Sequence, residues 1–120
     1  MDTSKQYIKM CEGAKEIQMS CCRSLPLENL FFIKKLNALS LYDSNRFRHE
    51  WYTDRIWLPR QDQLQEMIDG DWVKSFITFM WWYQDENTEI YKSMEQLWLS
   101  LVMKEEYGKT WNGEEWINVE

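Results

Sequence analysis

The sequence is poor in the residue types on which most enzyme chemistry depends. Its 120 residues include one histidine, His49, and three cysteines, Cys11 and the neighbours Cys21 and Cys22. A catalytic triad needs a base beside its nucleophile, and no nucleophile elbow or partner motif accompanies His49. The sequence also lacks HExxH, CxxC and EF-hand patterns, so we expect no metal site. Chemistry by a pair of carboxylates stays open, because acids distant in sequence can meet in space.

Glycine is scarce as well, with four isolated residues that form no phosphate-binding loop. We therefore predict no cofactor and assign no catalytic residue, and the pattern favours a non-enzymatic protein over an enzyme. The odd number of cysteines lacks the paired spacing of a secreted disulfide framework, which indicates a reducing, cytoplasmic setting. No apolar run reaches signal-peptide length or the roughly 20 residues that span a bilayer, so we expect neither secretion nor membrane insertion.

What the chain has in plenty is apolar and aromatic surface. Hydrophobic residues make up 44% of the sequence, and eight tryptophans and seven methionines are among them. A chain of this length and composition can bury enough area to offset the entropy of folding. We therefore expect one ordered domain over residues 1–120.

Charge is unevenly distributed. The net charge is −6, yet residues 34–60 carry six basic against three acidic residues, and residues 61–120 carry four lysines against thirteen carboxylates. An acidic chain is a poor general binder of nucleic-acid phosphates, whose affinity comes largely from clustered Lys and Arg. A local basic patch within residues 34–60 stays compatible with this balance.

Hydrophobic spacing predicts three helices. Residues 4–20 carry apolar side chains at three- and four-residue intervals behind a capping box of Thr3 and Gln6. Residues 90–107 keep a regular apolar stripe that Gly108 should end. A third, shorter helix should begin with Pro59 in its first turn, with Asp62 and Gln65 as its capping box and Gly70 as its stop.

The remaining segments favour β-structure. We expect strands at residues 30–36 and 39–42, a turn at 43–45, a short strand in "WYTDRIWL", and a hairpin around Asn112-Gly113. Residues 71–83, "DWVKSFITFMWWY", combine β-branched and aromatic residues with apolar side chains on both faces. A central strand fits this pattern best, and a buried helix is the alternative. The prediction is an α+β fold with about three helices packed on a short, largely antiparallel sheet and a C-terminal hairpin.

Tryptophan is the first source of candidate contact residues. Exposed indoles anchor protein interfaces, and eight exceed what a core of this size needs. Those at element ends or on the less certain faces, with the acidic residues beside them, are the interface candidates: Trp57, Trp82, Trp111, Glu114, Glu115 and Trp116. Such a surface predicts a protein partner, and exposed tryptophans also allow a homodimer.

Two other sites are weighed against this one. Arginines interleaved with aromatics in "RFRHEWYTDR" can pair with phosphates and stack on bases, which makes Arg46, Arg48, Arg55 and Arg60 candidates for nucleic-acid contact. A small ligand would instead need a tryptophan-lined pocket with polar groups. Its candidate residues are Trp57, Arg60, Gln61 and Gln63.

Two stretches, "WLPRQDQLQEMI" at 57–68 and "SMEQLWLSLVMKEEYGKTWNGEEW" at 93–116, resemble small uncharacterised proteins of tailed bacteriophages and prophages of gut-type bacteria. The resemblance implies a short cytoplasmic accessory protein of phage growth and transfers no activity or site residues. Together, these observations predict a non-enzymatic phage or prophage protein that binds a protein, such as host machinery, through an acidic, tryptophan-rich surface. A nucleic-acid-contacting regulator and a small-ligand-binding protein or enzyme are the alternatives.

Overall fold

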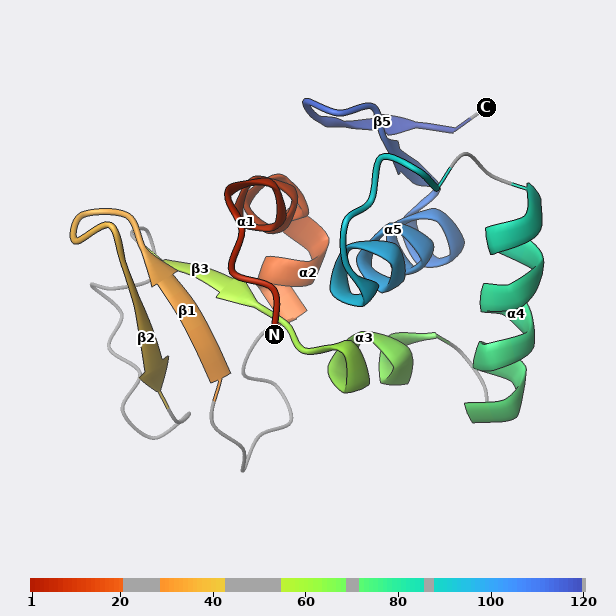
Figure 1. The fold of residues 1–120 in the computed structure, drawn as a ribbon, viewed down its shortest axis with the longest axis horizontal. Helices are drawn as coiled ribbons and strands as arrows, with labels where there is room; N and C mark the ends of the chain where they lie inside the picture. Colours follow the sequence, from red (N-terminus) through yellow and green to blue (C-terminus); the bar gives the residue numbers. More distant parts are fainter. Residues whose placement is uncertain (21–28, 43–54, 69–71, 86–87, 120) are drawn as a thin grey trace. The chain divides into compact units, whose positions relative to one another are not determined.

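The computed structural model describes residues 1–20, 29–42, 55–68, 72–85 and 88–119. Over these residues the chain forms five helices and five strands (Figure 1). All strand pairs are antiparallel, so the predicted α+β class is confirmed. The described chain divides into two compact units. We call Thr3–Pro59 the first-strand unit, and Met1–Asp2 together with Arg60–Glu120 the α4 unit. The prediction of a single domain stays a prediction.

The first-strand unit packs two short helices against a three-stranded sheet. Helices α1 (Lys5–Gly13) and α2 (Lys15–Ser20) replace the single helix predicted for 4–20. The break falls at Ala14, whose ψ of 73° leaves the helical region while its N–H still bonds the carbonyls of Met10 and Cys11. The predicted apolar stripe is buried, with Tyr7, Met10, Cys11, Ala14 and Ile17 fully enclosed. Ser4, rather than Thr3, caps α1 by accepting the Tyr7 N–H.

The sheet of this unit has the order β2-β1-β3, formed by Asn29–Ile33 (β1), Ala38–Tyr42 (β2) and Arg55–Leu58 (β3). The strand predicted for 30–36 ends earlier, because residues 34–37 form the turn into β2. Asn37 adopts a φ of 48° in this turn, a left-handed conformation that asparagine tolerates well. The turn predicted for 43–45 lies outside the described residues.

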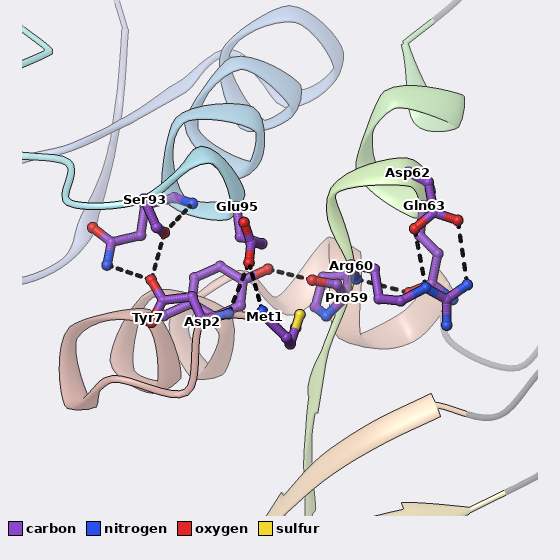
Figure 2. A network of polar contacts seen from close by, with 10 residues as sticks. Met1, Asp2, Tyr7, Pro59, Arg60, Asp62, Gln63, Ser93 and Glu95 are labelled. Atoms are coloured by element: carbon purple, nitrogen blue, oxygen red, sulfur yellow. Dashed lines mark hydrogen bonds and ion pairs between the residues drawn. The ribbon is translucent and has the colours of Figure 1, made fainter.

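Strand β3 lies at one edge of this sheet. Side chains from the helices form hydrogen bonds with backbone groups at this edge that no described strand pairs. The Gln18 amide accepts the Trp57 N–H at 2.8 Å and donates to the Trp57 carbonyl at 2.9 Å. The Tyr7 hydroxyl donates to the Pro59 carbonyl at 2.6 Å (Figure 2). Two helical side chains thus replace the strand that would otherwise pair with β3, which protects the edge.

The α4 unit begins with α3 (Gln61–Met67). The capping box predicted at Asp62 and Gln65 lies two residues earlier, because Arg60 is the N-cap and the Gln63 side chain accepts its N–H at 2.8 Å. Pro59 therefore precedes the cap instead of opening the helix. The helix ends at Met67, and the predicted stop at Gly70 lies outside the described residues.

Residues 71–83, predicted as a strand, are a helix for all of their described part. Helix α4 spans Trp72–Asp85, so the prediction of a central strand was wrong. The alternative of a buried helix is correct in its helix, but most of the described side chains of α4 are exposed. Helix α5 (Met94–Tyr107) follows, capped by Ser93, and ends at Gly108 with a φ of 65°, as predicted. It begins four residues later than predicted.

The predicted C-terminal hairpin is confirmed, with β4 (Lys109–Trp111) paired to β5 (Trp116–Asn118). Its loop holds four residues instead of two. The Asn112 side chain accepts the N–H groups of Glu114 and Glu115, both at 2.8 Å, and Gly113 adopts a φ of 101°. Asn112 and Gly113 thus make the turn, but the closing pair is Trp111 with Trp116.

Candidate functional site

Helix α4 packs against the rest of its unit through one narrow face. Ser75, Phe79 and Trp82 are buried at four- and three-residue spacing. The Phe79 ring stacks on Trp98 of α5, with centroids 4.5 Å apart and planes inclined by 19°. The ring centroids of Trp82 and Tyr91 lie 6.1 Å apart, and the Tyr91 hydroxyl accepts a hydrogen bond from the Ser100 hydroxyl. Aromatic packing therefore fixes this inner face.

The opposite side of α4 is also apolar, yet it is exposed. Trp81 is 71% exposed and Phe76 55%. We call this set of exposed large apolar residues the outer face of α4: Val73, Phe76, Ile77, Met80, Trp81 and Tyr83. Five of them follow the i, i+3, i+4, i+7, i+8 spacing that marks the buried stripe of an amphipathic helix. Contiguous exposed apolar patches of this kind are typical of protein, membrane or ligand contact surfaces.

A groove of about 570 Å³ lies beside the outer face, between α4 and the last turn of α5. Its α4 wall is largely apolar and includes Val73, Ile77 and Trp81, while Lys104 and Glu105 of α5 form the opposite wall. The groove is open to solvent and gives the apolar face a hollow beside its most exposed indole.

The predicted tryptophan anchors lie mostly inside their units. Trp57 is 5% exposed, and its indole donates to the Asn29 side chain at 3.2 Å. Trp82 and Trp111 are buried as well, because Trp82 belongs to the inner face of α4 and Trp111 packs against Trp116. This burial does not fit the predicted role of exposed indoles. Trp116 is half-buried, and Glu114 and Glu115 are exposed on the hairpin loop.

The arginines predicted to contact nucleic acid do not gather into one described patch. Arg46 and Arg48 lie outside the described residues. Arg55 is buried, with its guanidinium 4.7 Å from the centroid of the Phe31 ring. Arg60 forms an ion pair with Asp62 at 3.0 Å (Figure 2). The structure thus gives Arg55 and Arg60 local partners in their own units.

The residues predicted to line a ligand pocket also have structural roles within their own units. Gln63 caps α3 and Trp57 is a core residue of the first-strand unit. None of Trp57, Arg60, Gln61 and Gln63 lines the groove beside α4. Among the described ranges, no group of three or more His, Cys, Asp or Glu side chains could hold a metal ion.

A polar cluster fixes the start of α5 (Figure 2). The Asp2 carboxylate accepts the Ser93 hydroxyl at 2.5 Å and the Gln96 amide at 2.8 Å, and the Asp2 N–H donates to Glu95. Ser93 in turn accepts the Gln96 N–H as the N-cap. These contacts satisfy backbone groups at the helix N-terminus, which is a structural role.

The carboxyl of Asp62 titrates below its usual range. The hydrogen bond from Arg60 is the main cause that lowers its pKa from the ordinary 3.8. A lowered pKa in the folded state adds stability above the unfolded pKa, and this stability is lost as the pH falls through the folded value. We expect Asp62→Asn to lower the free energy of unfolding at pH 7 by less than about 1 kcal/mol, because the pair is largely exposed.

The same reasoning predicts how the difference in the free energy of unfolding between wild type and Asp62→Asn depends on pH. The unfolding curves of wild type and Asp62→Asn in urea should converge as the pH falls below the ordinary pKa of 3.8. Glu66→Gln, an exposed change on the same helix, should alter the free energy of unfolding at pH 7 by no more than about 0.5 kcal/mol. A difference that grows toward acid pH would contradict the assignment.

The part of the chain that the structure describes contains no helix with the length and apolar character needed to cross a bilayer. No family model matches the sequence, and neither the curated proteins nor the solved structures contain a significant match. The resemblance to phage proteins therefore stays a prediction.

Proposed function

We propose that the chain acts by binding protein, and that the outer face of α4 makes the contact. One observation carries the proposal: α4 is apolar on two opposite sides, and the described residues of its own unit cover only the side of Phe79 and Trp82. A helix that is apolar all round is normally buried. Association with a partner would remove the second side from water.

Energy supports the same interpretation. Burial of apolar surface contributes about 25 cal/mol per Å², and a large aromatic side chain carries about 200 Å². Trp81 and Phe76, exposed by 71% and 55%, would therefore each contribute roughly 3 kcal/mol on full burial. A few residues of this kind at the centre of a patch dominate the affinity of most interfaces.

The contact surface proposed here differs from the predicted one in position. The acidic hairpin residues Glu114 and Glu115 stay candidates for a polar rim, because charged residues at a rim steer association more than they strengthen it. The anchoring role passes from Trp57, Trp82 and Trp111 to Trp81. The resemblance to phage proteins makes bacterial host machinery the first class of partner to test.

The test is a binding experiment with matched variants. The tagged chain is immobilised and offered untagged copies of itself in one arm and a bacterial lysate in the other. We expect wild type to retain protein in at least one arm, and Trp81→Glu to lose it. The double variant Glu114→Lys/Glu115→Lys should keep most of the retention. Retention of nothing, or retention that Trp81→Glu leaves unchanged, would contradict the proposed function.

A further inference from the structure

We infer that the partner on the outer face of α4 is a second copy of this chain, in an isologous contact that pairs two α4 helices antiparallel. The inference rests on the proposed function and deepens it by naming the partner. It is carried by the area of the patch, by the lack of charge within it, and by the groove beside it.

The area fits one half of a stable dimer interface. At about 200 Å² per aromatic side chain, Phe76, Trp81 and Tyr83 expose roughly 350 Å². With Val73, Ile77 and Met80, each 40–49% exposed, the apolar total reaches roughly 500–600 Å². A standard interface buries about 800 Å² per partner, of which 56–65% is non-polar. The outer face alone supplies this non-polar share.

The charge pattern favours self-association. No Asp, Glu, Lys or Arg lies among the six residues of the outer face, and Lys74, Lys104 and Glu105 line the adjoining groove. When a surface meets its own copy across a twofold axis, any charge near that axis faces a like charge. A face with its charges at the rim avoids this repulsion. The net charge of −6 also disfavours an anionic lipid surface, which attracts basic segments.

The shape of the face is compatible with pairing. A helix of 14 residues is about 21 Å long, and an axis passing between Ile77 and Met80 would place Trp81 of one copy beside Ile77 of the other, on the same flank of the paired helices. Each protruding indole would then reach the neighbouring apolar wall of the groove, which Val73 and Ile77 form. Protrusion and hollow lie on the same surface, as an isologous contact requires.

The experiment is sedimentation velocity of the full chain from about 1 to 100 µM, a range that resolves micromolar association. We expect wild type to shift from monomer to dimer. Trp81→Glu should raise the dissociation constant at least about 30-fold, as expected for the loss of a hot-spot residue. Tyr107→Glu, which adds the same charge at an exposed tyrosine on α5, should change it by no more than about twofold. Circular dichroism of each variant checks its fold.

A mixing experiment tests the antiparallel arrangement. Ile77→Lys and Trp81→Glu chains should each be monomeric alone, and an equimolar mixture should form a heterodimer in which the new lysine faces the new glutamate. A wild-type monomer at about 100 µM would overturn the inference. If that monomer still captures another protein through Trp81, the proposed function stands. If it cosediments with neutral phosphatidylcholine vesicles instead, both the inference and the proposed function fail.

Discussion

Replacement of Trp98 by alanine should lower the free energy of unfolding by about 3–5 kcal/mol, the usual loss for a buried tryptophan. Trp98 is 2% exposed, and its ring carries the stacking contact with Phe79 that holds α4 on α5. The cavity left by alanine would remove both the buried area and this contact. Hydrogen exchange of the α4 amides should therefore accelerate more than that of the amides in β1 and β3.

Two variants make the Trp98 prediction specific. Trp98→Phe keeps a ring against Phe79 and removes an indole N–H that has no acceptor among the described residues. Since a buried unsatisfied donor costs about 1–3 kcal/mol, this variant should lose at most about half of what alanine loses. Trp81→Ala, at an exposed position on the same helix, should lose less than about 1 kcal/mol in protein too dilute to form the proposed dimer. Equal losses for Trp98→Ala and Trp81→Ala in urea unfolding would contradict the packing described for α4.

Replacement of Gln18 by leucine should destabilise the first-strand unit by about 1–3 kcal/mol, because it leaves partly buried backbone groups unsatisfied. The Gln18 amide bonds both the N–H and the carbonyl of Trp57, and it also donates to the Cys11 carbonyl at 3.1 Å. One side chain thus joins α1, α2 and the edge of β3. Leucine has a similar size but can make none of these bonds.

The Gln18 prediction is checked by urea unfolding with two comparisons. Met19→Leu, at an exposed neighbour in α2, should be close to neutral. Gln18→Glu keeps an acceptor for the Trp57 N–H but places a carboxylate against the Trp57 carbonyl, so its stability should recover as acid pH protonates the new side chain. A loss of less than about 0.5 kcal/mol for Gln18→Leu would show that water replaces these bonds.

Local signals predicted much of the fold. The stripe of residues 4–20, the stop at Gly108 and the turn at Asn112-Gly113 depend on neighbouring residues, so the sequence alone contained them. The break at Ala14 and the cap at Arg60 were not predicted, because Ala14 has no helix-breaking side chain and arginine is not a typical N-cap residue. Their positions depend on packing that the sequence pattern does not express.

The error at residues 71–83 has a definite origin. Apolar residues on both faces were taken as a strand covered on two sides, since β-branched and aromatic residues favour strands. The same residues form a helix with an inner face at Phe79 and Trp82 and an outer face at Phe76 and Trp81. The expectation of cover on both sides stays a prediction, and the proposed dimer would fulfil it. The spacing of Val73, Ile77 and Trp81 was the available signal for the helix.

Tryptophan burial was the least predictable property of the candidate site. Composition indicated that some indoles should be exposed, and position at element ends was used to choose among them. Trp57 and Trp111 lie near the ends of short strands and are nevertheless buried. Trp81 lies within a helix and is exposed. Which side of a helix is covered depends on tertiary packing, and a single sequence does not contain that information directly.

Oxidation of two methionines by dilute hydrogen peroxide tests the central claim without any substitution. Met80 lies on the outer face of α4 and Met94 at the start of α5, and their exposures are nearly equal at 40% and 41%. In dilute protein, both should convert to the sulfoxide at similar rates. In concentrated protein, oxidation of Met80 should slow several-fold relative to Met94, as contact between copies covers it. A ratio of the two rates that is independent of protein concentration would contradict the dimer that this face is proposed to form.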